Sequence, residues 1–338
     1  MTPRRAINAA LFAVILGAMG AGLGVAQVPA SPGEGRGNRG DVLQELSHAE
    51  ERWRGDPDGT GAAMDYAMLL LEAGQFERSR ELVGPILSAD ERPLDAVLTA
   101  ARLDYFMGDY DEAERLFKEV LTRDPASQRA LTGLVFTYYQ MNAFRRCAEL
   151  GEEALAGIRL PHLGLMRAFG DDTPWQVSWD GSARADIPFV ELDPLPVIEV
   201  EVGGRELAAI IDTGADMFIL DSATAESLGI EPVASMMGMF AGGKQAPIGF
   251  ARVDSLKLGT ATLRSVPISI LPTQALSLGE RKIEGIVGTA VLRQFLSTMD
   301  YPRGKLILRE RSQAGSSDFR QEVADMLSFM WQDGESHR

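Results

Sequence analysis

The chain has 338 residues, 45% hydrophobic and 24% charged, a size and balance that predict two folded domains and exclude wholesale disorder. Its 48 acidic residues against 33 Lys and Arg give a net charge of −15, which disfavours nucleic acid and anionic lipid as partners. His48, His162 and His337 lie far apart and the one cysteine excludes an intrachain disulfide, so we expect no metal site and no cofactor.

Residues 1–26 have the pattern of an export signal. Arg4 and Arg5 supply a positive charge, the run after them is uncharged, and small residues allow cleavage after Ala26. Because the run approaches membrane-spanning length, an uncleaved anchor is the alternative, although its many Gly and Ala residues favour cleavage. We expect a periplasmic or secreted protein, membrane-anchored if the signal is retained, with a flexible Pro- and Gly-rich leader at residues 27–40.

Residues 41–156 carry a helical pattern that repeats every 34 residues. Phe76, Tyr110 and Phe144 keep this step, and each follows a turn with Gly or Asn, which tolerate left-handed backbone. The repeat resembles the tetratricopeptide family, which implies helical hairpins stacked into a curved solenoid. Its concave face is a candidate surface for a protein partner, and a spacer or a dimerisation surface is the alternative role.

Cys147 occupies, in the third repeat, the small-residue position that Ala113 occupies in the second. This position lies between packed helices, so the sequence predicts a buried thiol and not a nucleophile.

Residues 157–187 lose the helical period and gain aromatic and turn residues, so we interpret them as a packed connector with Trp175 and Trp179 as core residues. From residue 188 to 312 the period becomes two and β-branched residues dominate, which predicts an all-β domain. Its first two strands flank Gly203-Gly204, as in a β-hairpin.

Two motifs in this β domain carry the functional prediction. An apolar strand ends in Asp212-Thr213-Gly214-Ala215-Asp216, and Ile286-Val287-Gly288 precedes a short helix and a final hairpin. Over residues 190–310 these features resemble the retropepsin-like aspartic proteases of the bacterial single-domain type. The resemblance implies a multidomain α and β chain, in which a helical tetratricopeptide-like solenoid precedes an all-β acid protease barrel.

The same resemblance implies the roles of the site residues. Asp212 would be catalytic, Thr213, Gly214 and Ala215 would complete the active-site loop, and Ile286, Val287 and Gly288 would thread behind it. Glycine suits that last position because it lets two backbones approach closely.

The chemistry of such a site needs two carboxylates. Two carboxyl groups held face to face share one proton and so supply an acid and a base together. Because the chain has one Asp-Thr-Gly, we expect Asp212 to pair with Asp212 of a second copy in a homodimer. Ala215 lacks the hydroxyl that Ser or Thr would direct at the carboxylate, so we expect activity that extends toward neutral pH.

The substrate side of the site is also implied. In the family, the position of Asp216 holds substrate backbone or forms a structural ion pair. Which residue would pair with Asp216 is left open, because Thr289-Ala290 stands where retroviral enzymes have Arg-Asn. Between the two motifs a substrate-covering flap is expected, and an ordinary hairpin is the alternative. The residues expected to bind substrate at the flap are Phe240, Ala241, Gly242 and Gly243.

Residues 313–338 are predicted to form a terminal amphipathic helix and tail that packs on its own domain. The sequence as a whole predicts an exported aspartic endopeptidase that hydrolyses protein or peptide substrates through a water molecule activated by an Asp dyad. The alternatives are a non-catalytic periplasmic scaffold that binds protein through its helical repeats, and a structural scaffold of the cell envelope.

Overall fold

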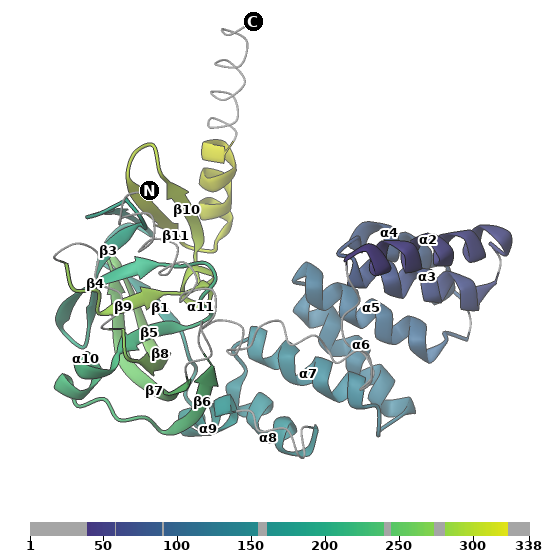
Figure 1. The fold of residues 1–338 in the computed structure, drawn as a ribbon, viewed down its shortest axis with the longest axis horizontal. Helices are drawn as coiled ribbons and strands as arrows, with labels where there is room; N and C mark the ends of the chain where they lie inside the picture. Colours follow the sequence, from purple (N-terminus) through teal and green to yellow (C-terminus); the bar gives the residue numbers. More distant parts are fainter. Residues whose placement is uncertain are drawn as a thin grey trace, which may run out of the picture. The chain divides into compact units, whose positions relative to one another are not determined.

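The computed structural model describes residues 39–57, 59–89, 91–154, 161–239, 245–273 and 281–323. The chain divides into two compact units between residues 167 and 168, and Figure 1 shows the helical unit and the β-rich unit. Residues 1–38, which include the predicted signal, lie outside the described part. No helix within that part is long and apolar enough to cross a membrane.

The first unit is built from helices that pack in sequence order. They are α2 (Arg39–Gly55), α3 (Thr60–Glu72), α4 (Phe76–Leu87), α5 (Leu94–Met107), α6 (Tyr110–Arg123), α7 (Gln128–Gln140) and α8 (Phe144–Ala154). Gly74, Gly108 and Asn142 join the two helices of successive hairpins with positive φ values of 74°, 84° and 59°. These three turns lie 34 residues apart, so the predicted repeat and its helical hairpins are confirmed.

Small residues in this unit make room for large ones. A side chain at Gly133 would meet the Phe117 ring at 2.3 Å, so glycine in α7 lets the aromatic residue of α6 pack against the helix backbone. Cys147 is 1% exposed and its thiol donates to the Val135 carbonyl at 3.4 Å. Burial raises the pKa of Cys147 to about 12, which keeps the thiol protonated at neutral pH.

The second unit is a β-barrel with a small additional sheet, and α9 (Pro161–Phe169) spans the boundary before it. The strands are β1 (Gln176–Trp179), β2 (Arg184–Pro188), β3 (Val197–Val202), β4 (Arg205–Ile211), β5 (Phe218–Asp221), β6 (Ala234–Met239), β7 (Gln245–Leu258), β8 (Ala261–Leu271), β9 (Gly285–Val287), β10 (Leu296–Asp300) and β11 (Lys305–Arg309). The larger sheet has the order β1-β8-β5-β9-β4-β3-β7-β6. Because β8 also pairs with β7, six of these strands close into a ring.

The short helices α10 (Ser222–Ser227) and α11 (Thr289–Leu292) follow β5 and β9. Strands β3 and β4 form the expected hairpin, in which Gly203 and Gly204 both have positive φ. The interior of the ring is filled by alternating apolar residues such as Ile198, Leu207 and Phe218, all at most 2% exposed. The all-β barrel after the helical repeats is therefore confirmed as the fold class.

The segment predicted as a connector differs from that prediction. Its strand β1 pairs with β8, and β2 joins β11 and β10 in a three-stranded sheet of order β10-β11-β2. Both strands are short, so the alternation of polar and apolar residues in Gln176–Trp179 and Arg184–Pro188 spans only four and five residues, and β1 is mostly exposed. Only pairing with partners more than 80 residues away defines them, which a local sequence pattern does not reveal.

The tryptophans of this segment pack as expected. Trp175 is 4% exposed and belongs to the barrel core, and the Trp179 ring meets Phe295 edge to face at 5.6 Å. The backbone is helical again over residues 313–323. That is the described start of the predicted terminal helix.

Candidate active site

The Asp212 loop leaves the barrel at the end of β4. The last residues of β4 pair in parallel with β9, Ile210 with Ile286 and Ile211 with Val287. The Asp212 N–H then donates to the Val287 carbonyl at 3.1 Å, and the loop closes through Ala215 N–H to the Asp212 carbonyl at 3.1 Å. The two motifs found in the sequence therefore lie side by side at the end of these strands.

Gly288 lies directly behind this loop. A β-carbon at Gly288 would meet three backbone carbonyl oxygens, those of Met217 at 2.4 Å, Asp216 at 2.5 Å and Ala215 at 2.8 Å. Backbone atoms cannot move aside as a flexible side chain would, so this close approach requires glycine. The next two residues fasten the loop, since Thr289 N–H donates to Ala215 at 2.8 Å and Ala290 N–H to Asp216 at 2.7 Å.

The two carboxylate oxygens of Asp212 have different surroundings. Oδ1 accepts a hydrogen bond from the Gly214 N–H at 2.9 Å. Oδ2 is buried and has no hydrogen-bond partner among the described residues. Burial raises the pKa of Asp212, and the Gly214 hydrogen bond only partly opposes it, so the pKa lies above the ordinary value. Such a carboxyl group is suited to hold a proton and to release it.

The other predicted loop residues lie around this carboxyl group. Thr213 and Gly214 are exposed, whereas Ala215 is 1% exposed and turned into the protein. Asp216 is half-buried at the end of the loop. The roles of Thr213, Gly214, Ala215 and Asp216 in catalysis or substrate binding remain predictions.

The expected flap lies in a described hairpin with an undescribed tip. Strands β6 and β7 pair without interruption up to Met239 opposite Gln245. The predicted substrate-binding residues Phe240, Ala241, Gly242 and Gly243 lie outside the described residues. On β6, the side chain of Met237 is 59% exposed.

Sequence reasoning missed a second aspartate, Asp221 at the end of β5. It is 1% exposed, and its carboxylate accepts hydrogen bonds from Thr273 N–H at 2.9 Å and Thr273 Oγ1 at 3.0 Å, and from Thr224 N–H at 3.2 Å. Burial alone would raise the pKa of Asp221, but these hydrogen bonds outweigh it and lower the pKa. The available signal was an Asp before a short helix, the usual N-cap of α10.

Asp221 supports the site from behind. Its N–H donates to the carbonyl of Glu284, the residue before β9, at 2.9 Å. It therefore ties the end of β5 and the end of β8 to the strand that leads to Gly288.

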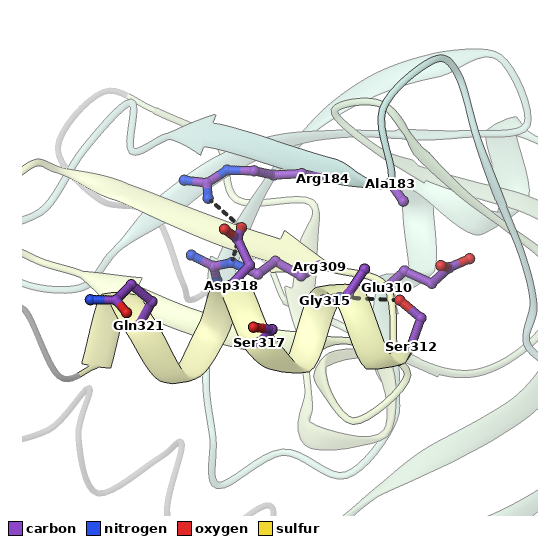
Figure 2. Close-up of a pocket in the computed structure, with 10 residues that line it drawn as sticks. Ala183, Arg184, Arg309, Glu310, Ser312, Gly315, Ser317, Asp318 and Gln321 are labelled. Carbon is purple, nitrogen blue, oxygen red and sulfur yellow. Dashed lines mark hydrogen bonds and ion pairs between the residues drawn. The ribbon is translucent and has the colours of Figure 1, made fainter.

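A cavity of about 540 Å³ lies elsewhere on this unit, beside the helical residues 313–323, and none of its lining residues belongs to the Asp212 loop. Figure 2 shows Asp318 of this helix between Arg184 and Arg309, and it forms an ion pair with each of them. Arg309 also forms an ion pair with Glu322. Arg309 is 1% exposed, so these carboxylates compensate a buried charge. We interpret the cavity as part of the contact that holds the terminal helix.

Within the described ranges no group of three or more His, Cys, Asp or Glu side chains is placed to hold a metal ion.

Comparison with known families agrees with this geometry. Residues 198–291 match the aspartyl protease family model, and residues 107–156 match a tetratricopeptide repeat model. The β-rich unit is thus similar to aspartyl proteases, and the helical unit to tetratricopeptide repeats. The aspartyl protease match contains both Asp212 and Gly288. No curated protein is significantly similar to the chain.

Some solved structures are similar to the β-rich unit and others to the helical unit. A retropepsin-like aspartic protease from Rickettsia conorii is 17% identical, over 40% of this chain and 94% of that protein, with a TM-score of 0.28. A tetratricopeptide repeat protein from Parabacteroides merdae is 21% identical, over 38% of this chain and only 50% of that protein, with a TM-score of 0.33. MamA from Desulfovibrio magneticus RS-1 is 19% identical over 40% of this chain and 79% of that protein, with a TM-score of 0.35.

Proposed function

We propose that the protein is an aspartic endopeptidase that hydrolyses peptide bonds in protein or peptide substrates. The observation that carries the proposal is the carboxyl group of Asp212, with one oxygen held by the Gly214 N–H and the other buried without a described partner. A second carboxyl group brought beside that of Asp212 would share a proton with it, and the pair would activate a water molecule while protonating the substrate carbonyl. The raised pKa of Asp212 suits it to the protonated half of such a pair.

The second carboxylate comes from another copy of the chain in this proposal. The sequence has a single Asp-Thr-Gly, and Thr213 and Gly214 are exposed in one protomer, where a second loop can meet them. A two-fold axis beside Asp212 then gives each partner the same role. Because residues 1–26 have the pattern of an export signal, we also propose that this dimer acts in the periplasm or outside the cell. Cell fractionation tests this part of the proposal separately.

The decisive experiment compares cleavage of a mixed peptide library by the wild-type protein and by Asp212→Asn. Wild type is expected to cut, and the variant to lose activity by about 10³-fold or more, since it lacks the acid–base group. Asp254→Asn is the matched control, because Asp254 is an exposed carboxylate on β7 of the same barrel. It should cut like wild type.

The mass of each sample is measured by light scattering in parallel. Activity that follows the dimer over a dilution series supports the shared dyad, whereas full activity of a monomer would contradict it. If neither wild type nor variant cuts although both are folded dimers, the peptidase proposal is wrong and the non-catalytic scaffold takes its place.

A further inference from the structure

A second cavity lies in the helical unit, between α4, α5 and α6. Its volume is about 320 Å³, which falls in the range of pockets that hold small ligands. The floor is apolar and includes Val83, Leu103 and Leu116, each at most 3% exposed. Arg80 and Arg115 also line the cavity and are exposed, so it opens to solvent.

The helical repeat explains why this space is not filled. Because the period is 34 residues, the interface of α4 with α5 corresponds to that of α6 with α7. In the latter, Phe117 and Tyr138 are 1% and 6% exposed, and the Tyr138 hydroxyl donates to Glu114 of α6 at 3.3 Å. Three residues that line the cavity are smaller than their counterparts 34 positions later. The pairs are Val83 and Phe117, Ala100 and Leu134, and Asp104 and Tyr138. The earlier interface therefore lacks two aromatic rings that the later one contains.

The charges at the edge of the cavity are balanced. Three arginines line it, Arg80, Arg92 and Arg115, which we call the rim arginines. Each of them forms an ion pair, with Asp104, Glu119 and Glu112 respectively. An anion would have to displace one of these carboxylates, and a cation would meet three guanidinium groups. The cavity thus favours an uncharged occupant.

Arginines of this unit already lie over aromatic rings. The guanidinium of Arg146 lies 4.5 Å from the centre of the Tyr138 ring, and that of Arg78 lies 5.7 Å from the centre of the Tyr66 ring. Such a cation–π contact favours an aromatic ring over an aliphatic side chain of the same size. The rim arginines offer the same contact to a ring inside the cavity.

We propose that this cavity binds the ring of a phenylalanine or tyrosine side chain of a partner polypeptide. The bound ring would bury apolar surface against Val83 and Leu103, as the Phe117 ring does one repeat later, and the rim arginines would stack on it. Small-molecule sites orient their ligand through a few polar groups, whereas the charged groups here are already paired. A side chain needs no such group, because its own backbone orients it. The proposal does not depend on the chemistry of Asp212.

The test uses fluorine NMR of capped short peptides that carry a central para-fluorophenylalanine. Otherwise identical peptides with Phe, cyclohexylalanine or Ala at this position displace them, and the protein carries Asp212→Asn so that nothing is cleaved. The Phe peptide is expected to act at a concentration at least about tenfold lower than the Ala peptide, because a ring is buried. Cyclohexylalanine has a similar size but no π face, so its peptide should be about threefold weaker than the Phe peptide.

Val83→Phe fills the cavity from within, as Phe117 does in the next repeat, and should abolish peptide binding while the protein melts at the same or a higher temperature. Binding at the Asp212 loop would survive this change, since Val83 lies in the other unit. Gly84→Leu serves if Val83→Phe is poorly folded, because Gly84 lines the cavity and a β-carbon there would have no atom within 4 Å. Ala126→Phe is the control, because it adds a ring at an exposed residue between α6 and α7, and it should bind like wild type.

Four results would each overturn the proposal. They are equal displacement by Phe and Ala peptides, equal displacement by Phe and cyclohexylalanine peptides, undiminished binding to a folded Val83→Phe or Gly84→Leu protein, and binding of toluene without binding of Phe peptides. The last result would make the cavity a site for a small apolar molecule and not for a polypeptide.

Discussion

Asp212 and Asp221 lie nine positions apart in one barrel, each at the end of a buried strand. The pKa values of their carboxyl groups are nevertheless shifted in opposite directions. Asp221 is almost fully buried, yet Thr224 and Thr273 satisfy its carboxylate, and its pKa is lowered. Asp212 is less buried, accepts one hydrogen bond, and has a raised pKa. Burial disfavours the ionised form at both positions, so the number of hydrogen bonds to each carboxylate decides whether its pKa is raised or lowered.

The difference separates a structural carboxylate from a reactive one. A carboxylate that accepts several donors is stable as an anion and a poor proton carrier, whereas one with an orphan oxygen is poised to share a proton. Asp221 thereby stabilises the frame that holds Gly288 against the Asp212 loop, and Asp212 stays available for chemistry. The stability and the pH response of variants at the two positions should therefore have opposite signs.

The largest expected effect on stability is that of Asp221→Asn. The amide turns a donor toward Thr273 or Thr224, so at least one buried hydrogen bond is lost and the free energy of unfolding falls by about 2–3 kcal/mol at pH 7. Because the folded-state pKa is lowered, this stabilisation exists above the unfolded value of about 3.9 and disappears as the pH falls through the folded value. Urea unfolding at several pH values measures the loss of unfolding free energy and its dependence on pH.

Asp254→Asn, on the exposed side of β7, is the control and should leave the unfolding midpoint unchanged. An Asp221→Asn protein as stable as wild type at pH 7 would show that the Thr273 and Thr224 bonds contribute nothing net.

Asp212→Asn should change stability less, and in the other direction. A raised folded-state pKa means that ionising Asp212 destabilises the folded protein once the pH exceeds the unfolded value of about 3.9. The amide carries no charge and still accepts from Gly214, so the variant should unfold at a higher urea concentration at pH 7, and this gain should vanish in acid. Both proteins are compared at one concentration, since dimerisation also stabilises. A lower midpoint for the variant at pH 7 is the contrary result.

The contrast between the two aspartates also marks what the sequence can reveal. The Asp212 loop and Gly288 are recognisable because a short motif between apolar strands specifies them locally, as Gly74 and Gly108 specify the hairpin turns. The environment of Asp221 is assembled from Thr224 and from Thr273, 52 residues away, and only the N-cap of α10 is visible locally.

Strands β1 and β2 belong to the same class of non-local features. Their four and five residues gain their structure from β8 and β11, and the alternation of polar and apolar residues in each is too brief to identify the partner strand. The tip of the expected flap lies outside the described residues, so the predictions for Phe240, Ala241, Gly242 and Gly243 stand as the sequence gives them.

The smallest expected effect is that of giving the Asp212 carboxylate one further hydrogen-bond donor, so that its surroundings become more like those of Asp221. In Ala215→Ser a hydroxyl is added next to a carboxylate that has one donor, at a residue whose N–H already donates to the Asp212 carbonyl. A hydrogen bond to the ionised form lowers the pKa of Asp212, so the acid limb of the kcat/KM profile should move to lower pH, by less than about one unit. Ala225→Ser, at a buried alanine of α10, controls for the added polar atom. The same shift should appear in the pH dependence of unfolding, which reports on Asp212 even without turnover. An acid limb that stays in place or moves upward would mean that the hydroxyl does not reach the carboxylate, and that burial alone sets the proton affinity of Asp212.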